Sequence, residues 1–273
     1  MEKSFMRVFL LSLVMAVAAP VVWACGPQSD CMVGDRHYRI AMPEGHDGAT
    51  NVPAIVFAHG FRGSARGVMR NGSLRRLSSE LGAALIAVKS DGPGWDLPNG
   101  PRTLNSSGAA EFAYFDAVLD DVMARFRVDP NRIMATGFSA GGMMVWNLAC
   151  TRPERFAGFA PIAGTFWLSP PQTCATPVKS LVHIHGDADK TVPLLGRRIG
   201  ETKQGEVPAA ISMYAEVGDF GAPQRVVSGD LSCKERLNDD GLVLSFCLFS
   251  GGHSFRTEHV RHAWTRLMMT GQQ

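Results

Sequence analysis

A serine flanked by glycines is the residue of this sequence whose neighbours most clearly indicate a catalytic role. Gly137-Phe138-Ser139-Ala140-Gly141 matches the pattern G-x-S-x-G. In this pattern the serine lies on a strained turn between a strand and a helix, where side chains two positions away on either side would collide. The N-terminus of the helix brings a partial positive charge to the reacting group. The pattern predicts Ser139 as a nucleophile; a glycine-rich turn without chemistry is the alternative.

Backbone N–H groups that could stabilise a negative charge are expected beside this serine. His59-Gly60-Phe61-Arg62-Gly63 follows an apolar strand, and the loop after such a strand supplies one donor of an oxyanion hole. We expect the N–H groups of Phe61 and of Ala140, the residue after Ser139, to be the two donors. One such donor lowers the reaction barrier by roughly 3–4 kcal/mol. His59 is expected to hold the loop rather than to act as a base.

A histidine and an acid would complete the catalytic set. His185-Gly186-Asp187-Ala188-Asp189 offers two carboxylates after another strand, although such a segment also makes a good structural turn. His253, in Gly251-Gly252-His253-Ser254-Phe255, is the one histidine of eight that combines a loop after a strand with a position beyond both the serine and the acids. The order serine, acid, histidine is that of α/β-hydrolases.

The chemistry follows from these side chains. Ser139 is a weak nucleophile until His253 removes its proton. A carboxylate then fixes the tautomer of the imidazole and stabilises the imidazolium. The acyl-enzyme that forms is hydrolysed by water, so this chemistry requires neither a metal nor a cofactor.

Short apolar runs alternate with amphipathic segments and predict the elements that position these residues. Such alternation indicates an α/β fold with a mostly parallel sheet and helices on both faces. Ligands of such sheets bind at the carboxyl ends of the strands, so the loops with reactive residues should meet at one edge. The sequence predicts strands over 54–58, 84–88, 132–136, 159–163, 180–185 and 242–249, and helices over 74–81, 111–126, 141–149 and 258–269.

Residues 90–107 form the longest irregular stretch and are rich in Gly, Pro and Asn. Irregular loops of this length are usually functional or disordered. We expect this one to be a wall of the substrate site, with Trp95 and, from the histidine loop, Phe255 as its aromatic contacts. A surface excursion without a role is the alternative.

The four segments together resemble a known family. His59-Gly60-Phe61-Arg62-Gly63, Gly137-Phe138-Ser139-Ala140-Gly141-Gly142-Met143, His185-Gly186-Asp187-Ala188-Asp189 and Gly251-Gly252-His253-Ser254 are similar to the secreted polyhydroxybutyrate depolymerase/feruloyl esterase family of α/β-hydrolases. The resemblance spans essentially residues 25–273. It implies carboxylic-ester substrates and places the acid at Asp189, where the carboxylate of the family's HGxxD pattern falls, with Asp187 second.

The resemblance also supports a disulfide between Cys150 and Cys174. It is imperfect after the catalytic histidine, where the family often carries an aromatic residue and a proline. Ser254-Phe255-Arg256 stands there instead, so that side of the pocket departs from the family's pattern.

The N-terminus has the pattern of a secretory signal. Lys3 and Arg7 precede an apolar run from Val8 to Val22, and Val22-Trp23-Ala24 resembles a cleavage site. The run is too short to favour a membrane-spanning helix. We expect residues 1–24 to be removed and residues 25–273 to form a single catalytic domain that is secreted or periplasmic.

Six cysteines follow this segment. An even number in an exported chain favours disulfides, and the absence of a C-x-x-C pair argues against a zinc site. Fifteen pairings are open; we favour the neighbours Cys25–Cys31, Cys150–Cys174 and Cys233–Cys247. A lipoprotein anchored through Cys25 is the alternative for the N-terminus.

A net charge of +2 without a basic cluster makes nucleic acid an improbable partner. The predicted partner is a small or oligomeric ester, preferred over solid polymer because no linker to a surface-binding module is visible. A serine peptidase or a lipase on the same fold is one alternative. A non-catalytic binding module is another. The sequence does not predict the oligomeric state.

Overall fold

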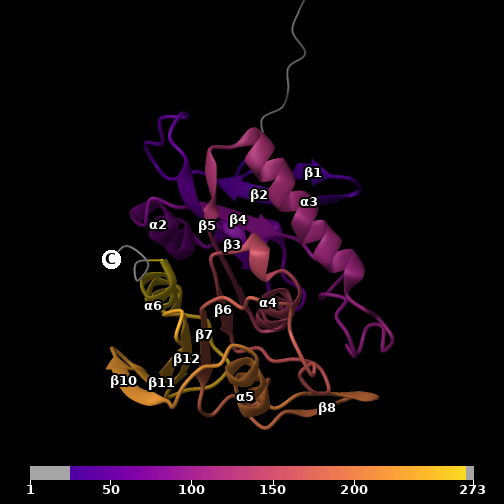
Figure 1. The fold of residues 1–273 in the computed structure, drawn as a ribbon. Helices are drawn as coiled ribbons and strands as arrows, with labels where there is room; N and C mark the ends of the chain where they lie inside the picture. The colour runs from indigo at the N-terminus through magenta and orange to yellow at the C-terminus, as the bar shows by residue number, and fades with distance from the viewer. Residues whose placement is uncertain (1–24, 269–273) are drawn as a thin grey trace, which may run out of the picture.

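A ten-stranded sheet forms the centre of the structure, a computed structural model that describes residues 25–268 (Figure 1). Its six central strands are parallel, which confirms the predicted α/β-hydrolase class. In spatial order they are β4 (Ala84–Val88), β3 (Val52–Ala58), β5 (Val128–Phe138), β6 (Gly158–Ile162), β7 (Leu181–Gly186) and β12 (Val243–Phe249).

Antiparallel strands extend the sheet at both edges, and none of them was predicted. The strands β1 (Cys31–Val33) and β2 (Arg36–Ala41) join beside β4, while β11 (Leu231–Leu237) and β10 (Gln224–Ser228) join beside β12. A separate two-stranded ribbon consists of β8 (Arg197–Ile199) and β9 (Thr202–Gln204).

Helices cover both faces of the sheet (Figure 1). One apolar cluster includes residues of α3 (Ala109–Arg125), α4 (Ala140–Thr151) and α5 (Val207–Val217). The cluster on the other face includes residues of α1 (Ala65–Arg70), α2 (Gly72–Glu80) and α6 (Thr257–Met268). A short 3₁₀ helix spans Pro153–Arg155. Within residues 25–268, no helix combines the length and the apolar character that crossing a membrane requires.

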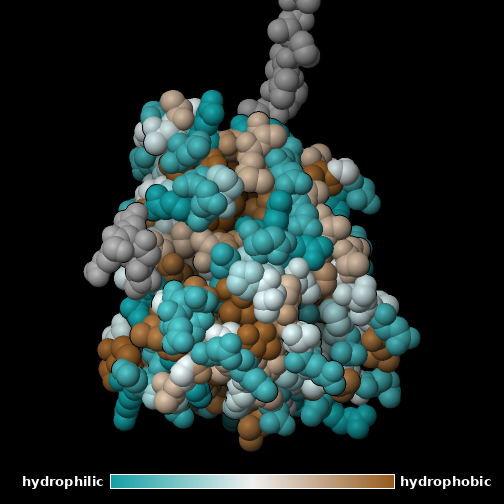
Figure 2. Space-filling view, viewed as in Figure 1, coloured by the Kyte–Doolittle hydropathy of each residue, from teal (hydrophilic) through white to brown (hydrophobic). Residues whose placement is uncertain are grey.

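Three of the central strands are buried along their whole length because both of their faces are covered. Every residue of β4, β6 and β7 is buried, as expected for parallel strands between two helical layers. On the outer face shown in Figure 2, hydrophobic side chains form separate patches among hydrophilic ones. The sheet therefore gives the loops at its carboxyl edge a rigid base.

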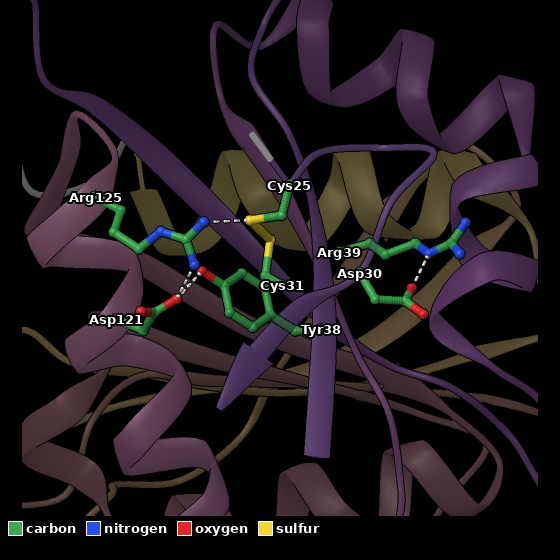
Figure 3. Close-up of a disulfide and its surroundings, with 7 residues drawn as sticks. All are labelled: Cys25, Asp30, Cys31, Tyr38, Arg39, Asp121 and Arg125. Atoms are coloured by element: carbon green, nitrogen blue, oxygen red, sulfur yellow. Dashed lines mark hydrogen bonds and ion pairs between the residues drawn. A yellow bond between two sulfur atoms is a disulfide. The ribbon is translucent and has the colours of Figure 1, made fainter. Parts of the chain in front are cut away.

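The cysteines form three disulfides between the neighbours favoured above. Cys25 is joined to Cys31, Cys150 to Cys174 and Cys233 to Cys247. Figure 3 shows the first bridge beside Arg125 of α3, whose Nη2 lies 2.8 Å from the Cys25 sulfur. His262 lies close to Cys233 and Cys247, but both sulfurs are committed to a disulfide and therefore do not form a metal site with it.

We expect mass spectrometry of the purified protein to find these three disulfides. Each bridge should stabilise the fold by about 2–4 kcal/mol, and less for the shortest loops. Digestion without reduction should release the three linked peptide pairs and no free thiol. A free Cys31 together with a lipid-modified Cys25 would show instead that the chain is a lipoprotein.

Candidate active site

Ser139 lies on a tight turn between β5 and α4. Its backbone has φ 60° and ψ −119°, a conformation that non-glycine residues rarely adopt. The Ser139 N–H donates to the Ile162 carbonyl of β6 at 2.9 Å. The side chain is partly exposed, so the turn holds the hydroxyl where a substrate can reach it.

The glycines of the G-x-S-x-G pattern are required by close backbone contacts. A Cβ atom on Gly137 would lie 2.5 Å from the Gly141 carbonyl oxygen. A Cβ atom on Gly141 would lie only 1.9 Å from the Ala58 carbonyl oxygen of β3. The first turn of α4 therefore packs directly against β3 and brings Ser139 to the loop that follows it.

That loop contains the predicted oxyanion donors. A Cβ atom on Gly60 would lie 3.5 Å from Cβ of Ser139, so this backbone passes beside the serine. Within the loop, the Arg62 N–H donates to Pro93 and the Gly63 N–H donates to Gly60. Among the described residues, no protein acceptor takes the N–H of Phe61 or Ala140. These two groups are thus available to a substrate oxygen.

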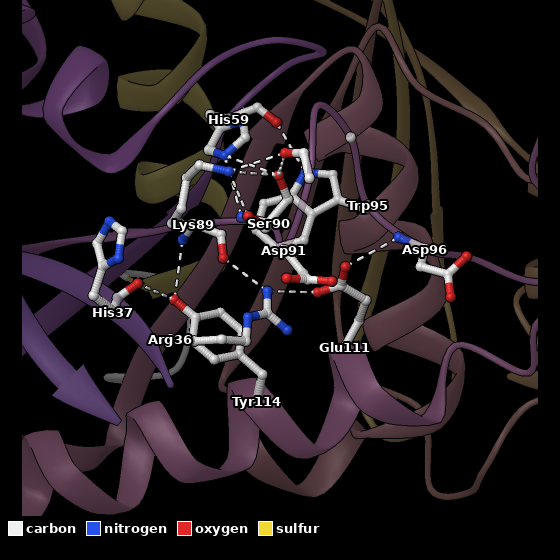
Figure 4. A network of polar contacts seen from close by, with 12 residues as sticks. Arg36, His37, His59, Lys89, Ser90, Asp91, Trp95, Asp96, Glu111 and Tyr114 are labelled. Carbon is white, nitrogen blue, oxygen red and sulfur yellow. Dashed lines mark hydrogen bonds and ion pairs between the residues drawn. The ribbon is translucent and has the colours of Figure 1, made fainter. Parts of the chain in front are cut away.

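His59 holds this loop in place, as the sequence predicts (Figure 4). Its Nδ1 lies 2.8 Å from the Gly60 carbonyl, and its Nε2 lies 3.2 Å from the Ser90 nitrogen. The first nitrogen must therefore donate and the second accept, which describes a neutral ring. The Trp95 indole donates to the His59 carbonyl at 2.9 Å. His59 therefore has a structural role, and Trp95 helps to hold the same loop.

The loop over residues 90–107 is fixed to the rest of the protein rather than being a free excursion. Glu111 of α3 accepts the Asp96 N–H at 3.0 Å and pairs with Arg36 at 2.7 Å. Ser106 Oγ donates to Asp96 Oδ2 at 2.9 Å. Figure 4 shows Glu111 and Arg36 beneath the loop. Trp95 is only 4% exposed, so most of its ring is packed inside the protein.

We expect the free energy of unfolding to fall as the pH drops below about 6.5. Burial lowers the pKa of His59 from 6.5 to about 4, so the unfolded chain binds a proton more readily than the folded one between these values. This contribution is fully present above pH 6.5 and is lost as the pH approaches 4, by about 3 kcal/mol for His59. Urea titrations at pH 7, 5.5 and 4 measure it.

The same titrations on His59→Gln provide the control, because glutamine cannot take up that proton. The variant should be less stable than the wild type at pH 7 but should lose less stability between pH 7 and pH 4. An equal loss in both proteins would contradict this assignment to His59.

Asp189 and His253 form a hydrogen-bonded pair at the same sheet edge. His253 Nδ1 lies 2.6 Å from Asp189 Oδ2. The other carboxylate oxygen accepts the N–H groups of Thr191 and Val192, both at 2.8 Å. The Asp189 side chain is fully buried, whereas that of His253 is 16% exposed. The Phe138 ring, next to Ser139, lies 4.7 Å from the His253 ring.

Asp187 has a different position. Its Oδ1 accepts the Gly251 N–H at 2.9 Å, and the Ala188 N–H donates to the Gly251 carbonyl. Asp187 thus ties the histidine loop to the acid loop, while Asp189 contacts the imidazole itself. The geometry favours Asp189 as the acid.

Asp189 is held in its ionised form. Burial alone would raise the pKa of this carboxyl group, but hydrogen bonds from His185, His253 and the Val192 N–H outweigh it and hold the pKa well below its ordinary value. An ionised carboxylate on Nδ1 leaves Nε2 of His253 free to accept a proton.

An apolar cavity of about 310 Å³ opens beside the serine turn. Phe61 and Ala140, the two predicted oxyanion residues, line it together with Trp95. Leu97, from the loop predicted as a wall, also lines it, together with Met143 and Trp167, which the sequence did not predict. Met143 could have been found from its place on the first turn of α4, but Trp167 follows β6 in a segment with no motif.

Phe255 lies elsewhere. Its ring packs edge-on against Phe57 at 5.4 Å and Phe138 at 5.9 Å. It lines a second cavity of about 210 Å³, bounded also by Gly60 and Gly63. The structure therefore does not bring Phe255 and Trp95 to one cavity, and a substrate contact for Phe255 stays a prediction.

The fold and the site define a serine hydrolase of the α/β-hydrolase class. Residues 104–204 match a family model described as Phospholipase/Carboxylesterase. The chain is 34% identical over 156 residues to "Putative esterase NocK" of Nocardia uniformis subsp. tsuyamanensis, covering 57% of this chain and 44% of that protein. It thus spans less than half the length of this relative.

Two other relatives match a larger and a smaller part of the chain. "Feruloyl esterase C" of Emericella nidulans is 26% identical over 268 residues, which is 91% of each protein. "Poly(3-hydroxyalkanoate) depolymerase C" of Paucimonas lemoignei is 40% identical over 73 residues, which is 27% of this chain and 16% of that one. An acetyl xylan esterase structure from Aspergillus awamori superposes with a TM-score of 0.58 at 17% identity over 84% of this chain and 91% of the other.

These matches confirm the resemblance predicted from the sequence. The chain is similar to a feruloyl esterase and to a polyhydroxyalkanoate depolymerase, and its fold is that of the α/β-hydrolases.

Proposed function

We propose that this protein is an exported esterase that cleaves small or oligomeric esters, with a preference for aromatic acyl groups. Ser139 is the nucleophile, His253 the general base and Asp189 the orienting acid. The observation that carries the proposal is the 2.6 Å contact between His253 Nδ1 and the buried Asp189 carboxylate, at the sheet edge where Ser139 stands on its strained turn.

Each group has one task in the reaction. His253 Nε2 takes the hydroxyl proton as Ser139 Oγ attacks the ester carbonyl. The N–H groups of Phe61 and Ala140 stabilise the negative charge on the carbonyl oxygen. His253 then returns the proton to the leaving alcohol, which leaves an acyl-enzyme. A water molecule, activated by the same imidazole, releases the acid and restores Ser139.

The substrate preference rests on the cavity beside Ala140. Its walls are mainly apolar and include the rings of Phe61, Trp95 and Trp167, which suits a flat aromatic group. Arg102, paired with Asp91 at 3.1 Å, supplies a polar group at the wall. Sites of this kind, apolar with few polar contacts, take discrete ligands. The feruloyl esterases among the relatives support this choice.

The test compares purified protein on methyl ferulate, aryl acetates, dissolved hydroxybutyrate oligomers and solid polymer granules at equal enzyme. We expect the highest kcat/KM for the feruloyl ester and little release from granules. Faster release from granules than from any soluble ester would contradict the proposal. No hydrolysis of any ester by folded protein would refute the esterase function.

Replacing Trp167 with alanine should raise KM for aromatic esters about three- to tenfold. Trp167 is half-buried at the cavity wall, and an aromatic pair contributes roughly 0.5–1.5 kcal/mol beyond area burial. KM for aryl acetates, whose acyl group is too small to reach the ring, should change less. Steady-state kinetics on both substrates measure the effect.

Met32→Ala is the control for this variant, since Met32 is 57% exposed on β1 and lines none of the cavities described at the active site. It should leave both KM values unchanged. An unaltered KM for methyl ferulate in Trp167→Ala would remove Trp167 from the acyl site.

Export is the second part of the proposal. Three disulfides fit an oxidising compartment. The predicted signal peptide, residues 1–24, lies outside the described residues. We propose that residues 25–273 are the mature catalytic domain, either secreted or periplasmic. A disulfide at Cys25, as in the structure, is incompatible with a lipid on the same sulfur, which argues against the lipoprotein alternative.

A further inference from the structure

Behind Asp189 lies a line of buried rings that the mechanism above does not use. The Trp146 indole nitrogen on α4 lies 3.1 Å from His183 Nδ1. His183 Nε2 lies 3.0 Å from His185 Nδ1. His185 Nε2 lies 2.8 Å from the Val192 carbonyl and 3.4 Å from Asp189 Oδ2. Trp146, His183 and His185 each have an exposed fraction of 0%.

The two ends of this line fix every proton in it. An indole nitrogen can only donate, so His183 Nδ1 must be an acceptor without hydrogen. A backbone carbonyl can only accept, so His185 Nε2 must carry a hydrogen. The remaining contact then needs one proton, which His183 Nε2 donates to His185 Nδ1. Three hydrogens make three hydrogen bonds, and no polar atom of the two imidazoles is left without a partner.

The arrangement also excludes a charged ring. A second proton on His183 would face the indole N–H, and a second proton on His185 would face His183 Nε2–H. On β12 the residues opposite His183 and His185 are Phe246 and Leu248, which carry no charge. Asp189 is the acid beside the line, and its own strongest contact is with His253. Burial accordingly lowers the pKa of His183 well below its ordinary value.

We infer that Trp146, His183 and His185 are positioning residues that fix the acid turn of residues 189–192 to the nucleophile helix. Trp146 lies two turns along α4 from Ser139, whose turn begins that helix. His185 holds the Val192 carbonyl, while the Val192 N–H donates to Asp189 Oδ1. The line thus joins the element that presents the nucleophile to the carboxylate that orients His253. This inference rests on the proposed function for its catalytic meaning.

The first test is independent of activity. Nuclear magnetic resonance of protein with isotope-labelled histidine should show two imidazoles as Nε2–H tautomers at pH 7. Their signals are assigned by their loss in His183→Asn and in His185→Gln. An Nδ1–H tautomer at either residue would overturn the inference whether or not the protein is an esterase.

The second test separates positioning from bulk stability. In His185→Gln the amide N–H can replace the imidazole donor to Val192, so kcat should stay within about threefold of the wild type. His185→Leu and Trp146→Phe lose a donor and keep apolar bulk. Their kcat should fall about tenfold, while KM changes less than twofold.

Tyr214→Phe is the matched control, because Tyr214 packs against the Trp146 ring at 5.9 Å and its hydroxyl bonds to Lys179 rather than to the line. It removes a buried hydroxyl from the same region and should leave kcat unchanged. Equal kcat in His185→Leu, Trp146→Phe and wild type would overturn the positioning role. A wild type inactive on every ester would refute the proposed function but leave the tautomer result standing.

Discussion

Replacing Ser139 with alanine should reduce ester hydrolysis by roughly 10⁴-fold or more and leave the fold intact. The substitution removes only the attacking oxygen. The backbone turn keeps its N–H contact with Ile162, and the oxyanion donors and the cavity stay in place. Steady-state kinetics, with circular dichroism and the melting temperature as measures of folding, test this result. A folded variant with near-normal turnover would show that another residue is the nucleophile.

The same loss is expected for His253→Ala and Asp189→Asn, and combining the substitutions should add little, because the three side chains act as one unit. Asp187→Asn is the matched control: it changes the same kind of carboxylate two residues away. Asp187 accepts only a backbone N–H of the histidine loop, so we expect a much smaller loss of kcat. A larger loss in Asp187→Asn than in Asp189→Asn would show that the acid is misassigned.

The central sheet could be predicted from the sequence because its strands are buried on both faces. The run Ala84–Val88 is apolar at every position, and its predicted bounds are those of β4. The predicted strand over 132–136 is the middle of β5, which begins four residues earlier at Val128. The first part of β5 contains Asp129, Pro130 and Asn131, residues that disfavour strands, so periodicity could not reveal it.

The antiparallel strands β10 and β11 at one edge of the sheet could not be predicted, and the reason is physical. All five residues of β10, Gln224–Ser228, are exposed, so no alternation between core and solvent marks the strand. In β11 the buried residues Leu231 and Cys233 are followed by the charged residues Lys234, Glu235 and Arg236. Strand β11 is held by pairing with β12, and β10 by pairing with β11, and composition does not record such pairing.

Local motifs predicted the candidate catalytic residues, whereas the cavity depends on contacts between distant segments. Ser139 and His253 each follow a strand within a glycine-rich motif, and the structure brings Asp189 to His253. The choice of Asp189 over Asp187 needed the family resemblance. Trp95 was found from its loop, but its hydrogen bond to His59 is set by the packing of two loops. The apolar residues around His183 and His185 predicted a strand, but nothing in the sequence predicted the hydrogen bonds of these two side chains.

Replacing Gly141 with alanine should destabilise the protein by about 3 kcal/mol or more and lower kcat at least 100-fold. The added Cβ atom would lie 1.9 Å from the Ala58 carbonyl oxygen. Ala58 belongs to β3, which pairs with β4 on one side and β5 on the other, so this oxygen cannot move aside without breaking the sheet. The first turn of α4 must shift instead, and it carries Ser139 and the Ala140 N–H with it.

The matched control is the same chemical change where space is open. A Cβ atom on Gly72, the first residue of α2, would meet no heavy atom within 4 Å. Gly72→Ala should therefore raise the free energy of unfolding by about 0.4–1 kcal/mol, since alanine restricts the unfolded chain, and leave kcat unchanged. Urea denaturation and kinetics on one aryl ester measure both variants. If Gly141→Ala were as stable and active as Gly72→Ala, the serine turn would not depend on contact between α4 and β3.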